Sequence, residues 1–417
     1  MSPEFYQAIA DRSWRRSGAL LYRPDPRKSC CPHYTVRLDS LAYKPNRNQR
    51  QALNKFNKYI LGPNYIKEAA RLYPRTREQA RLRDTEFEFP ARVHEAEYRN
   101  VKTPPEPAHK FTVTLEDDSF SEEKYVIYEK YQQLVHGEKP GDVSRRGFEK
   151  FLCNSPLRRG KFEGDDGTER DVGSFHQCYR IDGKLVAVGI LDLLPHCVSS
   201  VYFMYDESIY HFSPGKLSAM MEISLAIERG YRWWYAGFYI HSCPKMKYKM
   251  DFSPQYILDA ETYAYIPVDE GILKILEGPY QNLTKAHARW LQDKATLSAD
   301  ALNKLVKDDE TKNSNKDTGD GDEDSDEEWL NDSLSSVFLF DRNMPGIRSL
   351  EEIRDADLDK LPIHIRSSDV MLITGDISYW KDSRKSQYPG LKASIAELVA
   401  ALGEPDILKN VCLQFVQ

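Results

Sequence analysis

The chain has 417 residues, of which 41% are hydrophobic and 12% aromatic, so it is long and apolar enough for two or three packed domains. No apolar run approaches the roughly 18–20 residues of a membrane span, and no signal-peptide pattern opens the sequence. Its seven cysteines, an odd number in a large chain, do not form a disulfide framework, and this favours a reducing compartment: the cytoplasm, with the nucleus as a second location.

The net charge of −6 combines two regions of opposite sign. Between Asp308 and Glu328 lie 11 acidic and 2 basic residues, so the rest of the chain carries +3. Residues 1–83 contain 18 Lys and Arg against 6 Asp and Glu, with aromatic residues between them. Such a segment is either a phosphate-binding surface or an ordinary solvated basic face, and charge alone does not separate the two.

Residues 1–107 are expected to form a basic N-terminal module. Its predicted elements are a short helix, two strands and an amphipathic helix, at Pro3–Asp11, Leu20–Arg23, Thr35–Leu41 and Asn48–Ile60. The charged, proline-dotted stretch Arg71–Pro107 shows no pattern that assigns it to helix or strand.

Residues 108–306 are expected to form a mixed core. Its first predicted elements are a strand at Phe111–Leu115 and helices at Glu122–Val135 and Arg145–Cys153. Asp182-Gly183 is a hairpin signal, and the apolar run Leu185–Leu194 after it is typical of a buried strand.

The next strand is predicted at Val198–Tyr205, followed by a helix with Ser213 as N-cap and one apolar face, and by a strand at Trp233–Ile240. Hairpin, strand, helix and strand in this order outline an α+β fold with an N-acetyltransferase-like (GNAT) mixed-sheet core. Residues 271–306 are predicted to be helical, 307–328 to form an acidic disordered insert, and 329–417 to form a C-terminal extension packed on the core.

Residues 231–249 are the most informative stretch of the sequence. A run of aromatic residues suited to a strand continues into a turn that carries His241, Cys243, Lys245, Lys247 and Lys249. Three lysines at alternate positions on one side of a strand repel one another unless an anion faces them. The alternative is an edge strand whose lysines prevent aggregation.

Several motifs between about residues 5 and 260 occur together and in one order. They are Trp14-Arg-Arg-Ser-Gly18, Ser29-Cys-Cys-Pro-His-Tyr-Thr-Val-Arg37, Phe151-Leu-Cys-Asn-Ser-Pro156, Ser174-Phe-His-Gln-Cys-Tyr179, Leu191-Asp-Leu-Leu-Pro195 with Ser199-Ser-Val-Tyr-Phe203, and Gly237-Phe-Tyr-Ile-His-Ser-Cys-Pro-Lys-Met-Lys-Tyr-Lys249. In these stretches the chain closely resembles eukaryotic, fungal-like arginyl-tRNA–protein transferases.

The resemblance implies transfer of arginine from Arg-tRNA to proteins with N-terminal Asp, Glu or oxidised Cys, which marks them for degradation by the N-degron pathway. It implies Arg-tRNA, such protein substrates and the ubiquitin-ligase machinery as partners, and no membrane. Another GNAT-like aminoacyl or acetyl transferase, or a non-catalytic tRNA-binding adaptor, stays open as an alternative. The turn from Ser213 to Ser218 argues against acetyl-CoA, because its proline removes an amide donor.

Arginyl transfer needs a neutral amine, a stabilised ester carbonyl and close positioning of both reactants, but neither ATP nor a catalytic metal. Asp192, the only ionisable residue of its apolar strand, is the first candidate for the base. His241 is the competing proton acceptor. Each has a structural alternative, a buried aspartate that caps amides of a neighbouring loop or a histidine held by hydrogen bonds.

An anionic acceptor side chain requires fixed cations, preferably arginine. The candidates from the two N-terminal motifs are Arg15, Arg16, His33 and Arg37, while Lys245, Lys247 and Lys249 are predicted to act there or at the tRNA acceptor end. The candidates for stacking on the terminal adenine are Tyr202, Tyr205, Trp234 and Tyr239, although such aromatics are more often core residues.

The resemblance also implies an upstream Cys-x-x-Cys that joins Cys30-Cys31 in a metal or iron–sulfur site. The sequence lacks that pair, and two adjacent thiols do not supply four ligands. We therefore predict no bound cofactor here, with zinc or an iron–sulfur cluster only where the missing cysteines are present. The chain is expected either to be shortened at its N-terminus or to be a form without this site.

Overall fold

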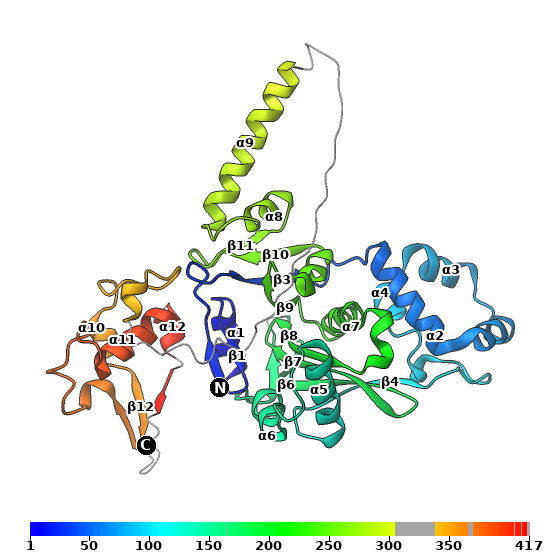
Figure 1. Ribbon diagram of the computed structural model, residues 1–417, viewed down its shortest axis with the longest axis horizontal. Helices are drawn as coiled ribbons and strands as arrows, with labels where there is room; N and C mark the ends of the chain where they lie inside the picture. The colour runs from blue at the N-terminus through cyan, green and yellow to red at the C-terminus, as the bar shows by residue number, and fades with distance from the viewer. Residues whose placement is uncertain (165, 305–337, 366–369, 404, 410, 415–417) are drawn as a thin grey trace. The chain divides into compact units, whose positions relative to one another are not determined.

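The computed structural model describes residues 1–164, 166–304, 338–365, 370–403, 405–409 and 411–414, and it separates into two compact units. Unit 1 comprises Met1–Leu258 and Tyr265–Val268, and unit 2 comprises Asp259–Ala264 and Asp269–Gln417 (Figure 1). The predicted acidic insert, residues 307–328, lies outside the described residues. Among the helices described, none combines the length and the apolar character that crossing a membrane requires.

Unit 1 is built on a nine-stranded mixed sheet, which confirms the predicted α+β class. The strand order is β11-β10-β3-β9-β8-β7-β6-β4, with β5 beside β6. The strands are β3 (His33–Asp39), β4 (Phe111–Asp117), β5 (Gly160–Glu163), β6 (Glu169–Ile181), β7 (Lys184–Leu194), β8 (Cys197–Tyr205), β9 (Trp233–Ile240), β10 (Gln255–Leu258) and β11 (Tyr265–Pro267). Only β8 and β9 run parallel to each other in this sheet.

The remaining elements of unit 1 are helices and one small hairpin. The helices are α1 (Pro3–Ala10), α2 (Arg47–Leu72), α3 (Arg77–Ala80), α4 (Phe89–Val93), α5 (Glu122–Val135), α6 (Arg145–Phe148) and α7 (Pro214–Glu228), and the hairpin joins β1 (Arg15–Ser17) to β2 (Leu20–Tyr22). The hairpin predicted at Asp182-Gly183 is confirmed: both residues have positive φ, as a tight two-residue turn between β6 and β7 requires.

Two helices cover opposite faces of the sheet. Tyr125 and Tyr128 of α5 pack in one core cluster with Met204 of β8. On β8 the preceding residue, Phe203, lines a small apolar space together with Leu217 of α7. Because successive strand residues point to opposite faces, α5 and α7 lie on the two sides of the sheet.

The helix α7 is buried on all sides rather than on one face. Every residue from Leu217 to Ala226 is buried, including Glu222. Its outer side is covered by α2 and α4, the latter from the stretch that had no assignment in the sequence. The predicted apolar face is therefore buried, and the opposite side of the helix is buried as well, because α2 and α4 supply a second cover.

The parallel strands β8 and β9 are paired over only part of their length. Ladder pairs join Cys197 to Trp233, Val198 to Trp234 and Ser199 to Tyr235. Beyond these, β8 continues to Tyr205 and β9 to Ile240 without further pairing to each other. The interval between β8 and β9 beyond Ser199 and Tyr235, where no ladder pair joins the two strands, lies next to α7.

Two local predictions are wrong. The three lysines do not lie on one side of a strand, because Pro244–Asp251 forms a 3₁₀ helix after β9 has ended. Ser213 makes no side-chain cap bond, since a 3₁₀ turn at Glu207–Phe212 runs directly into α7 and leaves Ser213 in the left-handed region at φ 59°. Both 3₁₀ segments lie where a proline interrupts the chain. At such positions neither a helical nor a strand pattern in the sequence predicts the local structure.

Unit 2 contains α8 (Glu270–Leu276), α9 (Leu283–Lys304), α10 (Asp355–Leu358), α11 (Leu391–Leu402) and α12 (Pro405–Leu408), with a small sheet of β12 (Pro362–Ile365), β13 (Val370–Ile373) and β14 (Leu413–Gln414). The helix predicted over 271–306 is interrupted between α8 and α9, where Gly278-Pro279 stands in the sequence.

Candidate functional site

Asp192 is held in a closed ion pair with Arg16. The guanidinium donates from Nε to Oδ2 at 2.7 Å and from Nη2 to Oδ1 at 2.6 Å, and the Ser174 hydroxyl donates to Oδ1 at 2.5 Å. The side chains of Arg16 and Asp192 are 1% and 0% exposed. The pair thus joins the N-terminal hairpin to β7 and presents neither an open oxygen to a substrate amine nor a free guanidinium to an acceptor carboxylate.

The ion pair predicts a loss of stability when one partner alone is removed. Asp192→Asn or Arg16→Met should lower the free energy of unfolding by about 3–5 kcal/mol, because an uncompensated buried group remains, whereas the double variant Arg16→Met/Asp192→Leu should regain most of it. Urea unfolding followed by circular dichroism measures this. An Asp192→Asn protein with unchanged stability but no activity would instead restore the role of Asp192 as the base.

The two candidate proton acceptors do not converge on one point. Asp192 is opposite Ser199 in the ladder, and Ser199 is opposite Tyr235 on β9. His241 lies six residues beyond Tyr235, roughly 20 Å along an extended strand. A site at the end of β9 therefore includes His241 and excludes Asp192.

Residues from both N-terminal motifs meet instead around Phe238 of β9. The Arg15 guanidinium lies 5.1 Å from the centre of the Phe238 ring, and the rings of His33 and Tyr22 lie 5.5 Å and 6.1 Å from it. Arg15 and Arg16 are neighbours on β1, so their side chains point to opposite sides, one toward Phe238 and the other toward Asp192.

Arg15 is a buried cation with no acidic partner in the part of the chain that the structure describes. Its residue exposure is 6%, and Nη1 donates to the carbonyl oxygens of Ala10 and Trp14. Nε and Nη2 are buried without a hydrogen-bond partner. Because an uncompensated buried charge is costly, this guanidinium is suited to an anion supplied from outside the chain.

His241 and Tyr239 are joined at the end of β9. The Tyr239 hydroxyl and His241 Nδ1 lie 3.0 Å apart, and Tyr239 is almost fully buried while His241 is half-buried. This bond orients the imidazole and leaves Nε2 for another partner, consistent with either of the two roles expected for His241.

Lys249 reaches back to β9, beside the interval between β8 and β9. Its Nζ donates to the Phe238 carbonyl at 2.9 Å. Burial lowers the pKa of Lys249 to about 8, with the charge of Glu222 acting in the opposite direction. An amine with this pKa is partly neutral near physiological pH and can accept a proton.

Glu222 of α7 is a buried carboxylate that sequence reasoning missed. It accepts hydrogen bonds from the Ser218 hydroxyl at 2.6 Å and from Trp234 Nε1 at 2.8 Å, and burial raises its pKa. The signal was the same as for Asp192, a lone acid among apolar residues. Glu222 was missed because a glutamate in a helix with a predicted apolar face is usually assigned to the polar face of that helix.

The other predicted binding residues lie away from the end of β9 or are engaged elsewhere. The Arg37 guanidinium is held between Trp233 and Tyr265, at 3.9 Å and 3.5 Å from their ring centres. The Tyr202 hydroxyl donates to Gln132 Oε1 at 2.7 Å, on the α5 side of the sheet. Tyr205 packs against the ring of Tyr131 on that same side, and Trp234 is the donor to Glu222. Lys245 donates to the Val135 carbonyl at 3.3 Å, and Lys247 is exposed.

The thiols of Cys30 and Cys31 do not by themselves form a metal site. Their sulfur atoms are 3.6 Å apart, and within the described residues no group of three or more His, Cys, Asp or Glu side chains is arranged to hold a metal ion. Two thiols do not fit the four-ligand requirement of zinc or an iron–sulfur cluster.

Two family models match the chain, and both concern the same family. The model described as "Arginine-tRNA-protein transferase, N terminus" matches residues 1–51, and "Arginine-tRNA-protein transferase, C terminus" matches residues 123–259. The first includes the N-terminal motifs around Arg15 and His33, and the second includes β9 with Lys249.

Curated relatives agree with these models. Arginyl-tRNA–protein transferase 1 of Arabidopsis thaliana is 40% identical over 177 residues, which cover 41% of this chain and 28% of the relative. The Drosophila melanogaster protein of the same name is 27% identical over 384 residues, covering 67% and 78%. An aspartate/glutamate leucyltransferase of Pseudomonas putida is 25% identical over 259 residues, covering 61% and 80%. This chain therefore spans less than a third of the length of the plant relative and most of the length of the other two.

Proposed function

We propose that this chain, which matches the arginine-tRNA–protein transferase family over residues 1–51 and 123–259, transfers arginine from Arg-tRNA to the α-amino group of proteins whose first residue is Asp, Glu or oxidised Cys. The observation that carries this proposal is the uncompensated Arg15 guanidinium beside Phe238, close to His33 and near Lys249. An acceptor carboxylate at Arg15 would bring the amine of the same residue toward the end of β9.

The acidic acceptor is supported by one further comparison. The Pseudomonas putida relative is named for aspartate and glutamate, although it is a leucyltransferase. The two proteins would then share the acidic acceptor and differ in the amino acid that they transfer. A carboxylate is also the group that a guanidinium binds most specifically.

In the proposed reaction the acceptor reacts as its neutral amine, and the neutral Lys249 amine takes the proton that the nitrogen loses as it attacks. The free amine attacks the ester carbonyl of Arg-tRNA, an amide bond forms, and the bond to the ribose oxygen of the terminal adenosine breaks. That oxygen leaves with a proton, for which His241, oriented by Tyr239, is the nearest candidate donor. The electrons balance without ATP, because the ester is already activated.

A GNAT-like core is part of the proposal. It is supported by the antiparallel β6–β7–β8 meander, the crossover through α7 and the parallel, partly unpaired β8 and β9. The N-degron pathway, its ubiquitin-ligase machinery and a cytoplasmic or nuclear location are proposed from the family alone. Zinc or an iron–sulfur cluster is proposed only for forms that add cysteines to Cys30 and Cys31.

The test is transfer of radiolabelled arginine from charged tRNA to peptides that start with Asp, Glu or Ala. We expect strong label on the Asp and Glu peptides and only a low rate of labelling on the Ala peptide. A mock reaction with leucyl-tRNA checks the transferred amino acid. Equal labelling of all three peptides would contradict the acceptor assignment, and the absence of label on every peptide would contradict the activity.

A further inference from the structure

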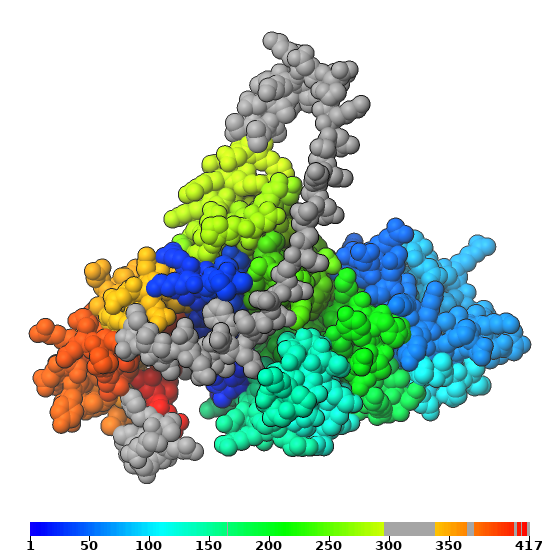
Figure 2. All heavy atoms as spheres, viewed as in Figure 1, coloured from blue at the N-terminus to red at the C-terminus, as the bar shows by residue number. Residues whose placement is uncertain are grey.

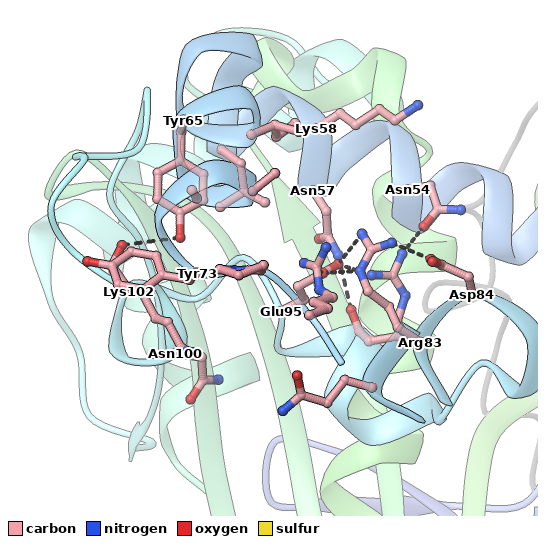
Figure 3. A pocket seen from close by; sticks show the side chains of 18 of the residues that line it. Asn54, Asn57, Lys58, Tyr65, Tyr73, Arg83, Asp84, Glu95, Asn100 and Lys102 are labelled. Atoms are coloured by element: carbon pink, nitrogen blue, oxygen red, sulfur yellow. Dashed lines mark hydrogen bonds and ion pairs between the residues drawn. The ribbon is translucent and has the colours of Figure 1, made fainter. Parts of the chain in front are cut away.

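A second region of unit 1, away from the site described above, forms a cavity of about 670 Å³ between α2 and the short helices that follow it (Figure 3). Its lining residues all fall between Asn54 and Lys102. The matched family segments, residues 1–51 and 123–259, include none of them. Neither the comparisons nor the proposed chemistry therefore assigns this cavity a role.

The cavity has an excess of positive charge. Five Lys and Arg line it against two acidic residues. One of those acids, Glu95, is shared by three guanidinium groups: Arg83 Nε lies 2.5 Å and Arg75 Nη2 3.4 Å from its carboxylate, and Arg92 also bonds to it. Arg83 also pairs with Asp84, at 2.5 Å, so two carboxylates face three guanidinium groups. The cluster keeps an excess of positive charge and is suited to a further anion.

Two buried polar atoms in the lining lack a partner in the described structure. They are Arg92 Nε, a donor, and Asn57 Oδ1, an acceptor, and their residues are only 5% and 3% exposed. Leaving such groups without hydrogen bonds costs on the order of 1–3 kcal/mol each. A ligand that carries both acceptors and donors would satisfy them, whereas a bare anion would satisfy only the first.

The tyrosines and the arginine–carboxylate cluster of the cavity lie at different ends. Figure 3 shows Tyr65, Tyr73 and Lys102 at one end, and Arg83 with Asp84 at the other. Aromatic faces stack on nucleic-acid bases, and guanidinium groups bind phosphates. This division matches the two chemical parts of a nucleotide.

The surroundings favour a nucleotide within a polyanion. Residues 44–83, which include α2 and α3, contain eleven Lys and Arg against two acidic residues. In Figure 2 this blue segment is exposed at the molecular surface. A small nucleotide would need only the cavity, but a chain of phosphates also uses the basic surface around it.

We infer that this cavity receives an unstacked nucleotide of the tRNA. Its base would lie against Tyr65 and Tyr73 and its phosphate near Arg75 and Arg83, with the neighbouring phosphates of the RNA near Lys58 and Lys102. The inference rests on the proposed function, which supplies the RNA. It adds a docking site distinct from the site of arginyl transfer. A free nucleotide has the same chemistry, and the experiment must separate the two sources.

The experiment compares two triple variants in the full chain. Lys58→Gln/Arg75→Gln/Lys102→Gln removes three exposed cavity charges, and Lys130→Gln/Lys139→Gln/Lys150→Gln removes three exposed charges elsewhere. The affinity for uncharged tRNA-Arg is measured by fluorescence anisotropy at several salt concentrations. We expect the cavity variant to bind at least tenfold more weakly at low salt. The slope of the logarithm of affinity against the logarithm of salt concentration should become less steep by about two, since each lost phosphate contact removes about 0.7–0.9 from it.

A second variant tests the base rather than the phosphate. Tyr65→Leu/Tyr73→Leu should weaken tRNA binding about five- to 100-fold without changing the salt slope, because stacking involves no counterion release. In arginyl transfer, the cavity-charge variant should raise KM for Arg-tRNA and leave kcat unchanged. Circular dichroism verifies that each variant is folded.

The outcomes separate this inference from the proposed function. If the unaltered chain transfers arginine but both cavity variants bind tRNA like the control, the inference is overturned and the function stands. If calorimetry shows AMP binding that the cavity variant loses while its tRNA affinity is unchanged, the nucleotide chemistry holds and tRNA as its source is overturned. If the unaltered chain neither transfers arginine nor binds tRNA, the proposed function and the tRNA docking site both fall.

Discussion

The Lys249→Met variant is expected to lose about 100-fold or more in kcat for arginyl transfer, the lower end of what a positioned proton acceptor contributes. Lys249 Nζ is held at the Phe238 carbonyl, and burial lowers its pKa to about 8, so a useful fraction is neutral at pH 7–8. Methionine keeps the length and apolar stem of the side chain but cannot take a proton. Steady-state transfer to an Asp peptide, with Arg-tRNA and peptide both saturating, measures the change in kcat.

The pH dependence gives a sharper readout of the same role. Below about pH 7, log(kcat/KM) should rise with a slope of two, because both Lys249 and the acceptor amine, with a pKa near 8, must lose a proton. In Lys249→Met the slope should be one. Lys249→Arg keeps the charge but cannot deprotonate, so it should be as slow as the methionine variant.

The same substitution should stabilise the fold at neutral pH. Between about pH 8 and 10.5 the unfolded chain holds a proton that the folded chain lacks, so the contribution of Lys249 to stability rises with pH over this window. At pH 7 the buried amine costs stability, and Lys249→Met should gain on the order of 1–3 kcal/mol. Lys247→Met, from the same 3₁₀ segment, is the matched control. Rescue by Lys249→Arg would assign Lys249 a role as a fixed cation instead, and full activity in Lys249→Met would contradict any role of Lys249 in the transfer.

Replacing Arg15 with methionine is the second large change, and it should remove acceptor selectivity. We expect kcat/KM for Asp and Glu peptides to fall about 100-fold, as is typical when one partner of a buried charged hydrogen bond is lost. The low rate with an Ala peptide should not change, because that peptide offers no carboxylate to Nε and Nη2. Competition between Asp and Ala peptides in one reaction measures the preference directly.

Two companions make the Arg15 experiment specific. Arg15→Lys should keep part of the preference, because it retains the charge but not the bidentate geometry. Lys28→Gln removes an exposed charge from the same module and should change nothing. A loss of equal size for Asp and Ala peptides in Arg15→Met would show that Arg15 supports the tRNA or the fold rather than the acceptor side chain.

Prediction from the sequence was most accurate for elements whose structure is determined by their own residues. The helix at Glu122–Val135 and the strand at Trp233–Ile240 have the predicted bounds, since each shows a regular apolar or aromatic pattern between clear breaks. It failed at the stretch Arg71–Pro107, whose short helices α3 and α4 contain too few residues for a periodic pattern. These short helices also line the second cavity, and no sequence motif indicated that cavity.

The sequence by itself determined the α+β class, the strand and helix order around α7 and the resemblance to the transferase family, because these depend on local patterns and motifs. Only the tertiary structure decided which charged residue faces which partner. Arg15 and Arg16 are neighbours with identical side chains, yet one is bound to Asp192, 176 positions away, and the other lies uncompensated against Phe238. The physical reason is that adjacent strand residues point to opposite sides, and distant segments supply the surroundings on each side.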